Sequence, residues 1–223
     1  MSVRRATVIW LLVAVAVAAT CVFVALTIAV TGSSSLALDS RAFKIADDVR
    51  TPWLDSTARV ITTLGLIAIV GSAVLVGAVV MIKHHDRARA AAVIAGAALA
   101  WVSVRIVKSV VDRPRPPDAL VHTTGQSYPS AHAANSIGWL ALAIALTVVI
   151  PSRAGRIAVI SAGAVLAVSV GLSRIYLRAH YASDVLAGEA LAVAMYAFAT
   201  IGAVAWQSRR ESATVSADRR PLH

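Results

Sequence analysis

Six long apolar stretches constrain this chain more than any other feature of its sequence. Each is about 20 residues long, the length that an α-helix needs to cross the hydrocarbon core of a bilayer. They cover residues 6–31, 58–82, 90–111, 133–150, 157–173 and 184–206. Hydrophobic residues make up 58% of the chain and charged residues only 14%, which excludes an ordinary soluble domain. Because helices satisfy their own backbone hydrogen bonds in lipid, the sequence predicts an all-α, polytopic membrane bundle of six transmembrane helices.

The distribution of Lys and Arg predicts the side of the membrane on which each loop lies. Basic residues with few acidic neighbours precede the first stretch, occupy the loops at 83–89 and 151–156, and follow the last stretch. Because such segments stay in the cytoplasm, both termini are predicted to be cytoplasmic. The net charge of +10 does not indicate a nucleic-acid partner, since the basic residues form no single patch with aromatic residues between them.

The chain is predicted to hold one membrane domain, residues 1–207, followed by a polar cytoplasmic tail, 208–223, without regular structure. The first stretch exceeds the length of a signal-peptide core and is interpreted as a retained span. Residues 32–57 have two open interpretations, an amphipathic helix at the outer interface or a plain connector. Cys21 is the single cysteine, which excludes an intramolecular disulfide and paired thiolate ligands. The adjacent histidines of the 83–89 loop point in different directions, so a solvated turn is predicted there and not a metal site.

The first of three polar clusters ends the third apolar stretch. Lys108 lies near the outer end of this stretch, and basic groups in an apolar helix usually face a polar cavity or a partner. The helix is expected to end at the proline-rich run of residues 113–117, because proline cannot continue it. This rigid turn is predicted to hold Arg115 toward the same place as Lys108.

The second cluster begins the fourth apolar stretch. Ser130 is a favourable N-cap after Pro129, so the amides of Ala131 and His132 are predicted to lie at the positive end of a helix, which suits an anion. In isolation a serine followed by a histidine is a weak signal, and His132 could equally be an interfacial side chain.

The third cluster connects the fifth and sixth stretches. It contains Ser173 and Arg174, followed by His180 and Asp184. A spacing of four places the carboxylate beside the imidazole, where it would set the tautomer and support positive charge on the ring. Taken alone, the pair could simply anchor the start of a helix. The cations of the other clusters on the same side favour a chemical role.

Together the clusters resemble the three signature motifs of the type 2 phosphatidic acid phosphatases, a superfamily of lipid phosphate phosphatases. The motifs are Lys108-x6-Arg115-Pro116, Pro129-Ser130-Ala131-His132 and Ser173-Arg174-x5-His180-x3-Asp184. One departure is Ala131, which replaces the usual glycine. Alanine adds a methyl group and keeps the amide, so the anion cradle is retained if this position needs no positive φ.

The resemblance implies a metal-independent phosphohistidine mechanism without a cofactor. In it His180 attacks phosphorus, Asp184 orients His180, and His132 protonates the leaving oxygen. The implied phosphate ligands are Lys108, Arg115, Ser130, Ala131 and Arg174. Auxiliary candidates that the motifs do not assign are Ser173, Arg178, Tyr128 and Arg113.

The predicted location is the cytoplasmic membrane, with active-site loops 108–132 and 173–184 on the extracytoplasmic side. The substrate is then a lipid whose phosphate lies at headgroup level. Polyprenyl diphosphate is favoured because the chain is compact, and phosphatidic acid or phosphatidylglycerol phosphate fits the same geometry. A phospholipid-binding or transport protein is an alternative from another class, although binding needs no oriented imidazole. A vanadate-dependent haloperoxidase agrees less well with six spans. The sequence indicates no oligomeric state.

Overall fold

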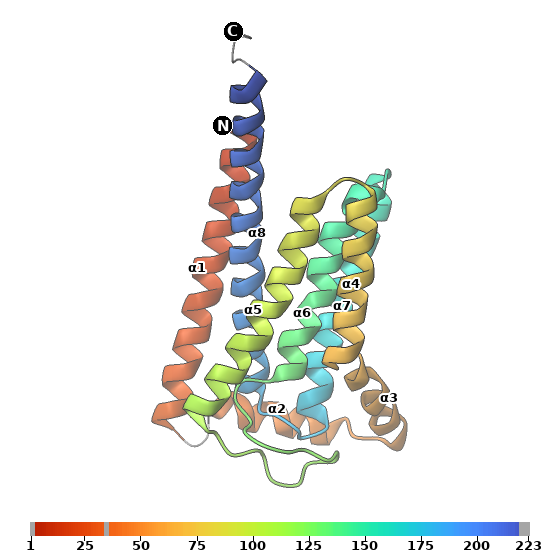
Figure 1. Ribbon diagram of the computed structural model, residues 1–223. Coiled ribbons are helices and arrows are strands. Elements are labelled where there is room, and N and C mark those ends of the chain that lie inside the picture. Colours follow the sequence, from red (N-terminus) through yellow and green to blue (C-terminus); the bar gives the residue numbers. More distant parts are fainter. Residues whose placement is uncertain (1–2, 34–35, 219–223) are drawn as a thin grey trace.

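The computed structural model describes residues 3–33 and 36–218, and the side chains of residues 5–33 and 36–210. Every regular element in these ranges is a helix (Figure 1). In chain order they are α1 (Val3–Gly32), α2 (Ala37–Asp48), α3 (Pro52–Thr63), α4 (Ile67–Lys83), α5 (Arg87–Val111), α6 (Ala131–Leu146), the short 3-10 helix η1 (Thr147–Val149), α7 (Arg153–Tyr176) and α8 (Ala182–Asp218). The predicted all-α class is confirmed.

Among the described residues, five helices are long and apolar enough to cross a membrane. They are α1, α5, α6, α7 and α8, and they correspond to the first and the third to sixth apolar stretches. The predicted second span is divided into α3 and α4, which are bent by 50° relative to each other and together complete a sixth passage if they are counted as one span.

Contacts with α6 explain the break between α3 and α4. A Cβ atom on Gly65 would lie 2.7 Å from Val170 Cγ1 and 3.0 Å from the carbonyl oxygen of His132, so this turn packs closely against neighbouring helices. Two side chains of α6 satisfy carbonyls that the break leaves free: Trp139 Nε1 donates to Leu64 at 2.8 Å, and Asn135 donates to Gly65 at 3.1 Å. Because unsatisfied backbone groups are costly in a membrane, the break depends on tertiary contacts that hydropathy does not report.

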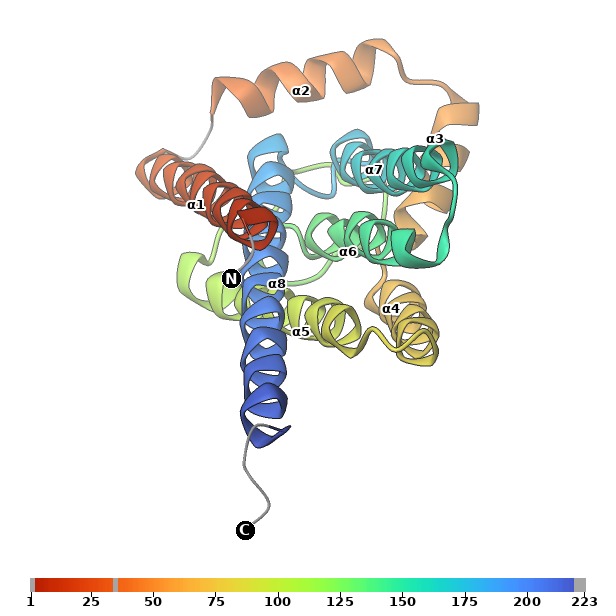
Figure 2. The same cartoon turned by 90° about the horizontal axis from the view of Figure 1, so that it is seen from above.

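Helix α6 lies at the centre of the bundle and packs against α4, α5, α7 and α8, while α1 packs against α8. The end-on view shows these helices side by side (Figure 2). The start of α1, the end of α8 and the α4–α5 and α6–α7 loops lie at one end of the bundle (Figure 1). The long 112–130 loop and α2 lie at the other end.

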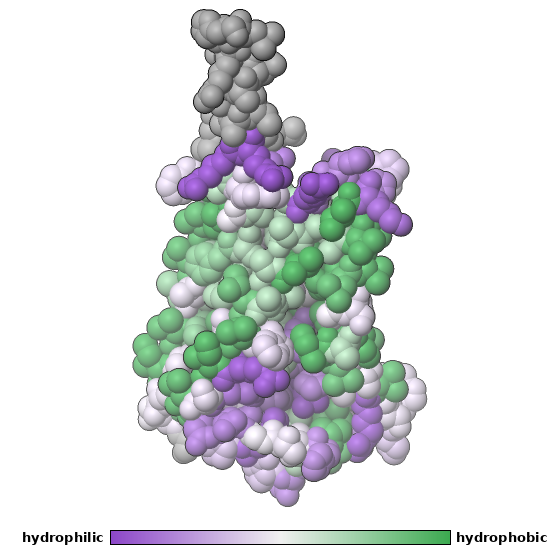
Figure 3. Space-filling model, viewed as in Figure 1, coloured by the Kyte–Doolittle hydropathy of each residue, from purple (hydrophilic) through white to green (hydrophobic). Residues whose placement is uncertain are grey.

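The surface of the bundle is apolar between two polar ends (Figure 3). Trp10, Val76 and Val165 are 71%, 66% and 63% exposed, which an aqueous environment would not favour. These side chains belong to three helices around the bundle, where lipid would surround them. The chain is therefore a multi-pass membrane protein.

The structure resolves one open interpretation of the sequence and differs from one prediction. Residues 37–48, within the segment that had two open interpretations, form α2, which runs along one edge of the bundle beside α7 and α8 (Figure 2). The predicted tail without regular structure is instead helical as far as Asp218, because α8 continues through it. Residues 208–218 contain no Gly or Pro, and extending an existing helix adds one hydrogen bond for each residue that is ordered. Residues 219–223 of the predicted tail lie outside the described residues.

Candidate active site

The three polar clusters meet at the end of the bundle that carries α2. The first cluster lies at the end of α5 and in the following loop, the second at the start of α6, and the third between α7 and α8. Arg115 Nη1 lies 3.2 Å from His180 Nε2, which joins the first cluster to the third. The Ser130 amide donates to the backbone oxygen of Asp184 at 2.9 Å, which joins the second to the third. The tertiary structure therefore brings together residues that are up to 76 positions apart in the sequence.

His180 and Asp184 lie side by side. His180 Nδ1 is 3.4 Å from Asp184 Oδ2, and both side chains are buried. His180 precedes the first turn of α8, and the carboxylate also accepts the Tyr181 amide at 3.0 Å, so Asp184 caps this helix. A proton on Nδ1 directed at the carboxylate leaves Nε2 unprotonated, and the Nε2 lone pair faces the Arg115 guanidinium, from which it accepts. This arrangement is suited to nucleophilic attack by the imidazole.

The environment of His180 keeps the imidazole neutral. Burial lowers the pKa of His180 to about 4, and the neighbouring Asp184 carboxylate offsets only part of this change. Nearby positive charges on Arg174 and Arg115 lower the pKa further. At neutral pH the ring therefore carries the free electron pair that a nucleophile needs.

Two cations of the first cluster are held by the loop that follows them. Arg115 donates to the carbonyls of Thr124 at 2.8 Å, Gly125 at 2.9 Å and Ala179 at 2.8 Å. Lys108 Nζ donates to the Gln126 carbonyl at 2.6 Å. These bonds hold both side chains at the site and order the loop around them. Burial lowers the pKa of Arg115, while the Asp184 carboxylate raises it.

The second cluster forms the N-terminus of α6. Ser130 is the N-cap and its hydroxyl accepts the Ala133 amide at 3.4 Å. Its backbone lies against α8, where a Cβ on Gly188 would be 2.4 Å from the Ser130 carbonyl oxygen. Ala131 is not among the described residues with positive φ, so alanine fits here without strain and its amide stays at the helix terminus. His132, in the first turn, lies close enough to Arg174, His180 and Arg115 for their charges to act on it.

Arg174 lies in the last turn of α7 and is only 6% exposed. Its Nη1 donates to Thr62 Oγ1 on α3 at 2.8 Å. Its Nε is the single buried side-chain nitrogen or oxygen without a hydrogen-bond partner in the described part of the chain. A buried, unsatisfied donor of a charged group is costly, and an anion in the site would satisfy it.

Three of the four auxiliary candidates, Tyr128, Ser173 and Arg178, have their hydrogen bonds elsewhere. The Tyr128 hydroxyl lies 2.8 Å from Thr27 Oγ1 on α1. Ser173 Oγ donates to the carbonyl of Val170 in its own helix at 2.6 Å. Arg178 forms an ion pair with Asp47 on α2. These three side chains connect the site to its surroundings in the structure, and none of these bonds reaches His180 or Asp184.

Sequence reasoning missed Ser127 and Asp39, and it named Arg113 only as an auxiliary candidate without a partner. Ser127 Oγ donates to Asp184 Oδ2 and lies 3.5 Å from His180 Nδ1. Arg113 donates to Asp184 Oδ1 and also to Asp39 of α2. Ser127 is a polar neighbour of the second motif and could have been suspected on that ground. Asp39 carried no signal, because its segment had no assigned place in the fold.

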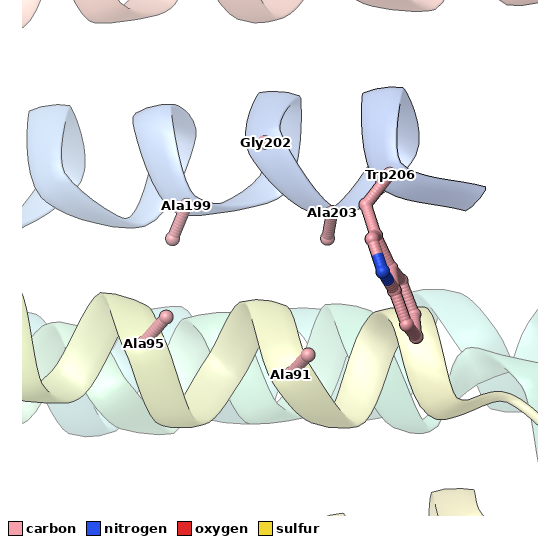
Figure 4. A pocket seen from close by; sticks show the side chains of 6 residues that line it. All are labelled: Ala91, Ala95, Ala199, Gly202, Ala203 and Trp206. Carbon is pink, nitrogen blue, oxygen red and sulfur yellow. The ribbon is translucent and has the colours of Figure 1, made fainter. Parts of the chain in front are cut away.

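Two cavities lie away from these clusters. One of about 600 Å³ is bounded by α1, α5, α6 and α8, and residues of its lining include Asp86, Arg89 and Gln207. The other, about 330 Å³, lies between α5 and α8 and is lined by small apolar side chains and Trp206 (Figure 4). Both contain residues from the start of α5, at the opposite end of this helix from Lys108. Neither is lined by a residue of the three motifs.

Comparisons with known proteins agree with this arrangement. A family profile described as the PAP2 superfamily matches residues 89–209. Phosphatidylglycerophosphatase B of Bacillus subtilis (strain 168) is 28% identical over 178 residues, which cover 78% of this chain and 87% of that protein.

Two solved structures have a similar fold. The crystal structure of a transmembrane PAP2 type phosphatidylglycerolphosphate phosphatase from Bacillus subtilis matches with a TM-score of 0.75 and 26% identity, covering 82% of this chain and 93% of that chain. The structure of Aquifex aeolicus LpxE matches with a TM-score of 0.61 and 19% identity, covering 74% and 96%. At that identity the second likeness concerns the fold alone.

Proposed function

This chain belongs to the PAP2 superfamily and is a membrane lipid phosphatase, and from this premise we propose that it hydrolyses phosphatidylglycerol phosphate through a phosphohistidine intermediate. The observation that carries the mechanism is the setting of His180. Its Nδ1 faces Asp184 at 3.4 Å, and its Nε2 faces the Arg115 guanidinium at 3.2 Å. A phosphoryl group that takes over the Arg115 guanidinium would thus lie next to the unprotonated Nε2 of the imidazole.

In the first step, His180 Nε2 forms a bond to phosphorus and the bond from phosphorus to the lipid oxygen breaks. His132 gives a proton to this leaving oxygen, and Asp184 stabilises the positive charge on the phosphorylated imidazole. In the second step, water attacks phosphorus and transfers a proton to His132. The bond between phosphorus and Nε2 breaks, which returns the electron pair to His180 and releases inorganic phosphate.

The phosphoryl oxygens are assigned to donors from all three motifs. These donors are Lys108, Arg115, Ser130, the Ala131 amide and Arg174. The buried Nε of Arg174, which has no partner among the described residues, and the helix terminus at Ala131 support this assignment, because both offer donors to an anion. Donors that are already in place stabilise the charge of the transition state without having to reorganise.

The site is assigned to the extracytoplasmic side of the cytoplasmic membrane. The basic loops at 83–89 and 151–156 lie at the opposite end of the bundle from α2 (Figure 1), and basic loops stay in the cytoplasm. A lipid phosphate in the outer leaflet would then reach the site with its tails still in the bilayer.

The substrate assignment is supported by the names of two relatives, the Bacillus subtilis phosphatidylglycerophosphatase B and the transmembrane phosphatidylglycerolphosphate phosphatase. The test is phosphate release by purified full-length protein from phosphatidylglycerol phosphate, phosphatidic acid, polyprenyl phosphate and polyprenyl diphosphate. We expect the highest kcat/KM for phosphatidylglycerol phosphate. A preference for polyprenyl diphosphate, which the sequence favoured, would overturn the substrate assignment. Binding without phosphate release from any of these lipids would instead identify a binding or transport protein.

Activity is expected to be independent of divalent metal ions. In the described part of the chain, no three His, Cys, Asp or Glu side chains gather in a group that could hold a metal ion, and Mg²⁺ is usually bound through carboxylates together with phosphate oxygens. The measurement is the rate of phosphate release before and after prolonged dialysis against EDTA, with rates expected to agree within about twofold. A loss that added Mg²⁺ or Zn²⁺ restores would contradict the mechanism.

The pH dependence of kcat/KM is expected to reflect the buried His180. Because burial lowers the pKa of His180 to about 4, its lone pair is lost to a proton only below that pH. The rate is therefore limited by His180 near pH 4 and not near the ordinary value of 6.5. The measurement uses two lipid phosphates whose own pKa values differ, so that titration of the substrate can be recognised. An acidic limb near pH 6.5 that is common to both would contradict the expectation.

A further inference from the structure

Asp39 of α2 lies in the centre of the hydrogen-bond network behind the site. It is only 2% exposed. Its Oδ1 accepts the Ser183 amide at 2.8 Å, and its Oδ2 accepts the Ser183 hydroxyl at 2.9 Å and Arg113 Nη2 at 2.9 Å. A buried carboxylate needs such donors to remain charged. The donors come from segments 74 and 144 residues farther along the chain.

Arg113 connects Asp39 to the partner of the proposed nucleophile. While Nη2 donates to Asp39, Nη1 donates to Asp184 Oδ1 at 2.5 Å and to the Ser183 hydroxyl at 2.8 Å. The guanidinium lies over the ring of Tyr181, with Cζ 4.0 Å from the centroid. Arg113 is therefore shared between two carboxylates. Each carboxylate binds one of the two Nη nitrogens of the planar guanidinium, so the two contacts together fix its orientation.

The sharing has an electrostatic consequence. Two buried carboxylates face one guanidinium, so the positive charge of Arg113 does not fully neutralise Asp184. The remaining negative charge is available to His180, which becomes positive when it is phosphorylated. Without the charge of Asp39, Arg113 would be paired with Asp184 alone. Arg113 would then neutralise more of the Asp184 charge, and Asp184 would stabilise the positively charged imidazole less.

We propose that Asp39 is a positioning residue that acts through Arg113 to hold Asp184 against His180 and to prevent Arg113 from fully neutralising the Asp184 charge. The inference rests on the proposed phosphohistidine mechanism and adds to it a residue from outside the three motifs. It also gives α2 a role, because this helix then completes the site.

Further contacts along the same face of α2 support this role. Asp39, Phe43 and Asp47 are spaced by four residues, so they share one helix face. Phe43 lies 5.6 Å from the Tyr181 ring and 4.8 Å from the Arg178 guanidinium, and Asp47 forms the ion pair with Arg178. Arg178 and Tyr181 flank His180 in the sequence. The α2 face therefore contacts the loop that carries His180 on both sides of it.

The test is the Asp39→Asn variant of the full-length protein, with Asp48→Asn as its control. Asp48 is on the same helix and is exposed, and asparagine has nearly the same shape as aspartate without its charge. The measurements are kcat and KM for a lipid phosphate that the wild type hydrolyses, inhibition by vanadate, and thermal unfolding. Vanadate imitates the pentacoordinate transition state. Its affinity therefore reports how well the site is positioned for the transition state, which substrate binding in the ground state does not report.

For Asp39→Asn we expect kcat to fall by about 10- to 100-fold with KM within about twofold of the wild type. The inhibition constant of vanadate is expected to rise by a similar factor, and Asp48→Asn is expected to behave as the wild type. A loss of kcat that merely follows the folded fraction, with unchanged affinity for vanadate, would overturn the inference. So would wild-type kinetics in Asp39→Asn.

Two further arms keep the outcome interpretable. If Asp39→Asn does not fold, Asp39→Glu replaces it, because glutamate keeps the charge and moves it by one methylene group. The same fall in kcat and in vanadate affinity is expected, to a smaller extent, and unchanged values would overturn the inference. A wild type that releases no phosphate from any lipid would contradict the proposed function itself, whereas an active wild type with a wild-type-like Asp39→Asn variant contradicts only the role of Asp39.

Discussion

Replacing His180 with alanine is expected to reduce the rate of phosphate release by at least about 1,000-fold, the scale on which loss of a nucleophile acts in enzymes with covalent intermediates. The variant removes the single atom, Nε2, that the mechanism bonds to phosphorus. The measurements are kcat for phosphatidylglycerol phosphate and the amount of phosphorylated protein that can be trapped during turnover. The stability of the trapped phosphoprotein is then compared in acid and in base. Phosphohistidine is expected from the wild type, with the base stability of a phosphoramidate, and no phosphoprotein is expected from the variant.

A second histidine variant shows whether the effect is specific to the nucleophile or follows from removing any histidine near the site. His122 lies in the same loop as Arg115 and is exposed, so His122→Ala is expected to keep activity within about twofold of the wild type. Both variants should remain folded in detergent. If His180→Ala keeps more than about a tenth of the wild-type activity while folded, His180 is not the nucleophile.

Replacing Arg174 with alanine is expected to lower kcat by about 100- to 1,000-fold, corresponding to about 2.7–4 kcal/mol of transition-state stabilisation. The guanidinium is buried, and its Nε has no partner in the described part of the chain, so its donor is available for an anion. The loss should appear mainly in kcat, because a donor in a dry site acts most strongly on the charge that develops in the transition state. The measurement is steady-state kinetics with the same lipid.

Arg105 provides the matched control for Arg174. It is exposed near the end of α5, and its guanidinium lies 4.3 Å from the centroid of the Trp101 ring, so Arg105→Ala removes an arginine outside the site. Activity within about threefold of the wild type is expected. Arg174→Lys keeps the charge but not the planar fork, and an intermediate kcat is expected for it. An Arg174→Ala variant that is folded and as active as Arg105→Ala would contradict the role of Arg174 in holding the phosphoryl group.

Much of the fold could be predicted because the hydropathy that defines a membrane span is a property of consecutive residues. A helix in lipid needs only a sufficient apolar length, and this property can be read from consecutive residues. The helix start at Ser130 was likewise visible, since an N-cap depends on the residues that follow it. The break at Gly65 was not visible. It is stabilised by Asn135 and Trp139 of α6, and no local pattern indicates that these side chains face it.

The chemistry of the site was partly predictable for a different reason. The spacing of four between His180 and Asp184 suggested that these side chains are neighbours, and their atoms lie 3.4 Å apart. Arg115 and His180 are 65 residues apart, and only the resemblance to a known family joined them. Ser127 and Asp39 belong to no signature that was recognised, so their contacts with the site emerged only from the coordinates.

The sequence by itself determined that this chain enters a membrane as a set of helices. It also determined that the chain carries two histidines, a carboxylate and several cations in the order and spacing of the phosphatase motifs. These properties depend on composition and on short spacings. The tertiary structure decided that α2 lies against α7 and α8 at the end of the bundle that holds the site, and that Arg113 is shared between Asp39 and Asp184. Such contacts join distant segments, and their stability comes from burial and from charge pairing in three dimensions, which the order of residues along the chain does not display.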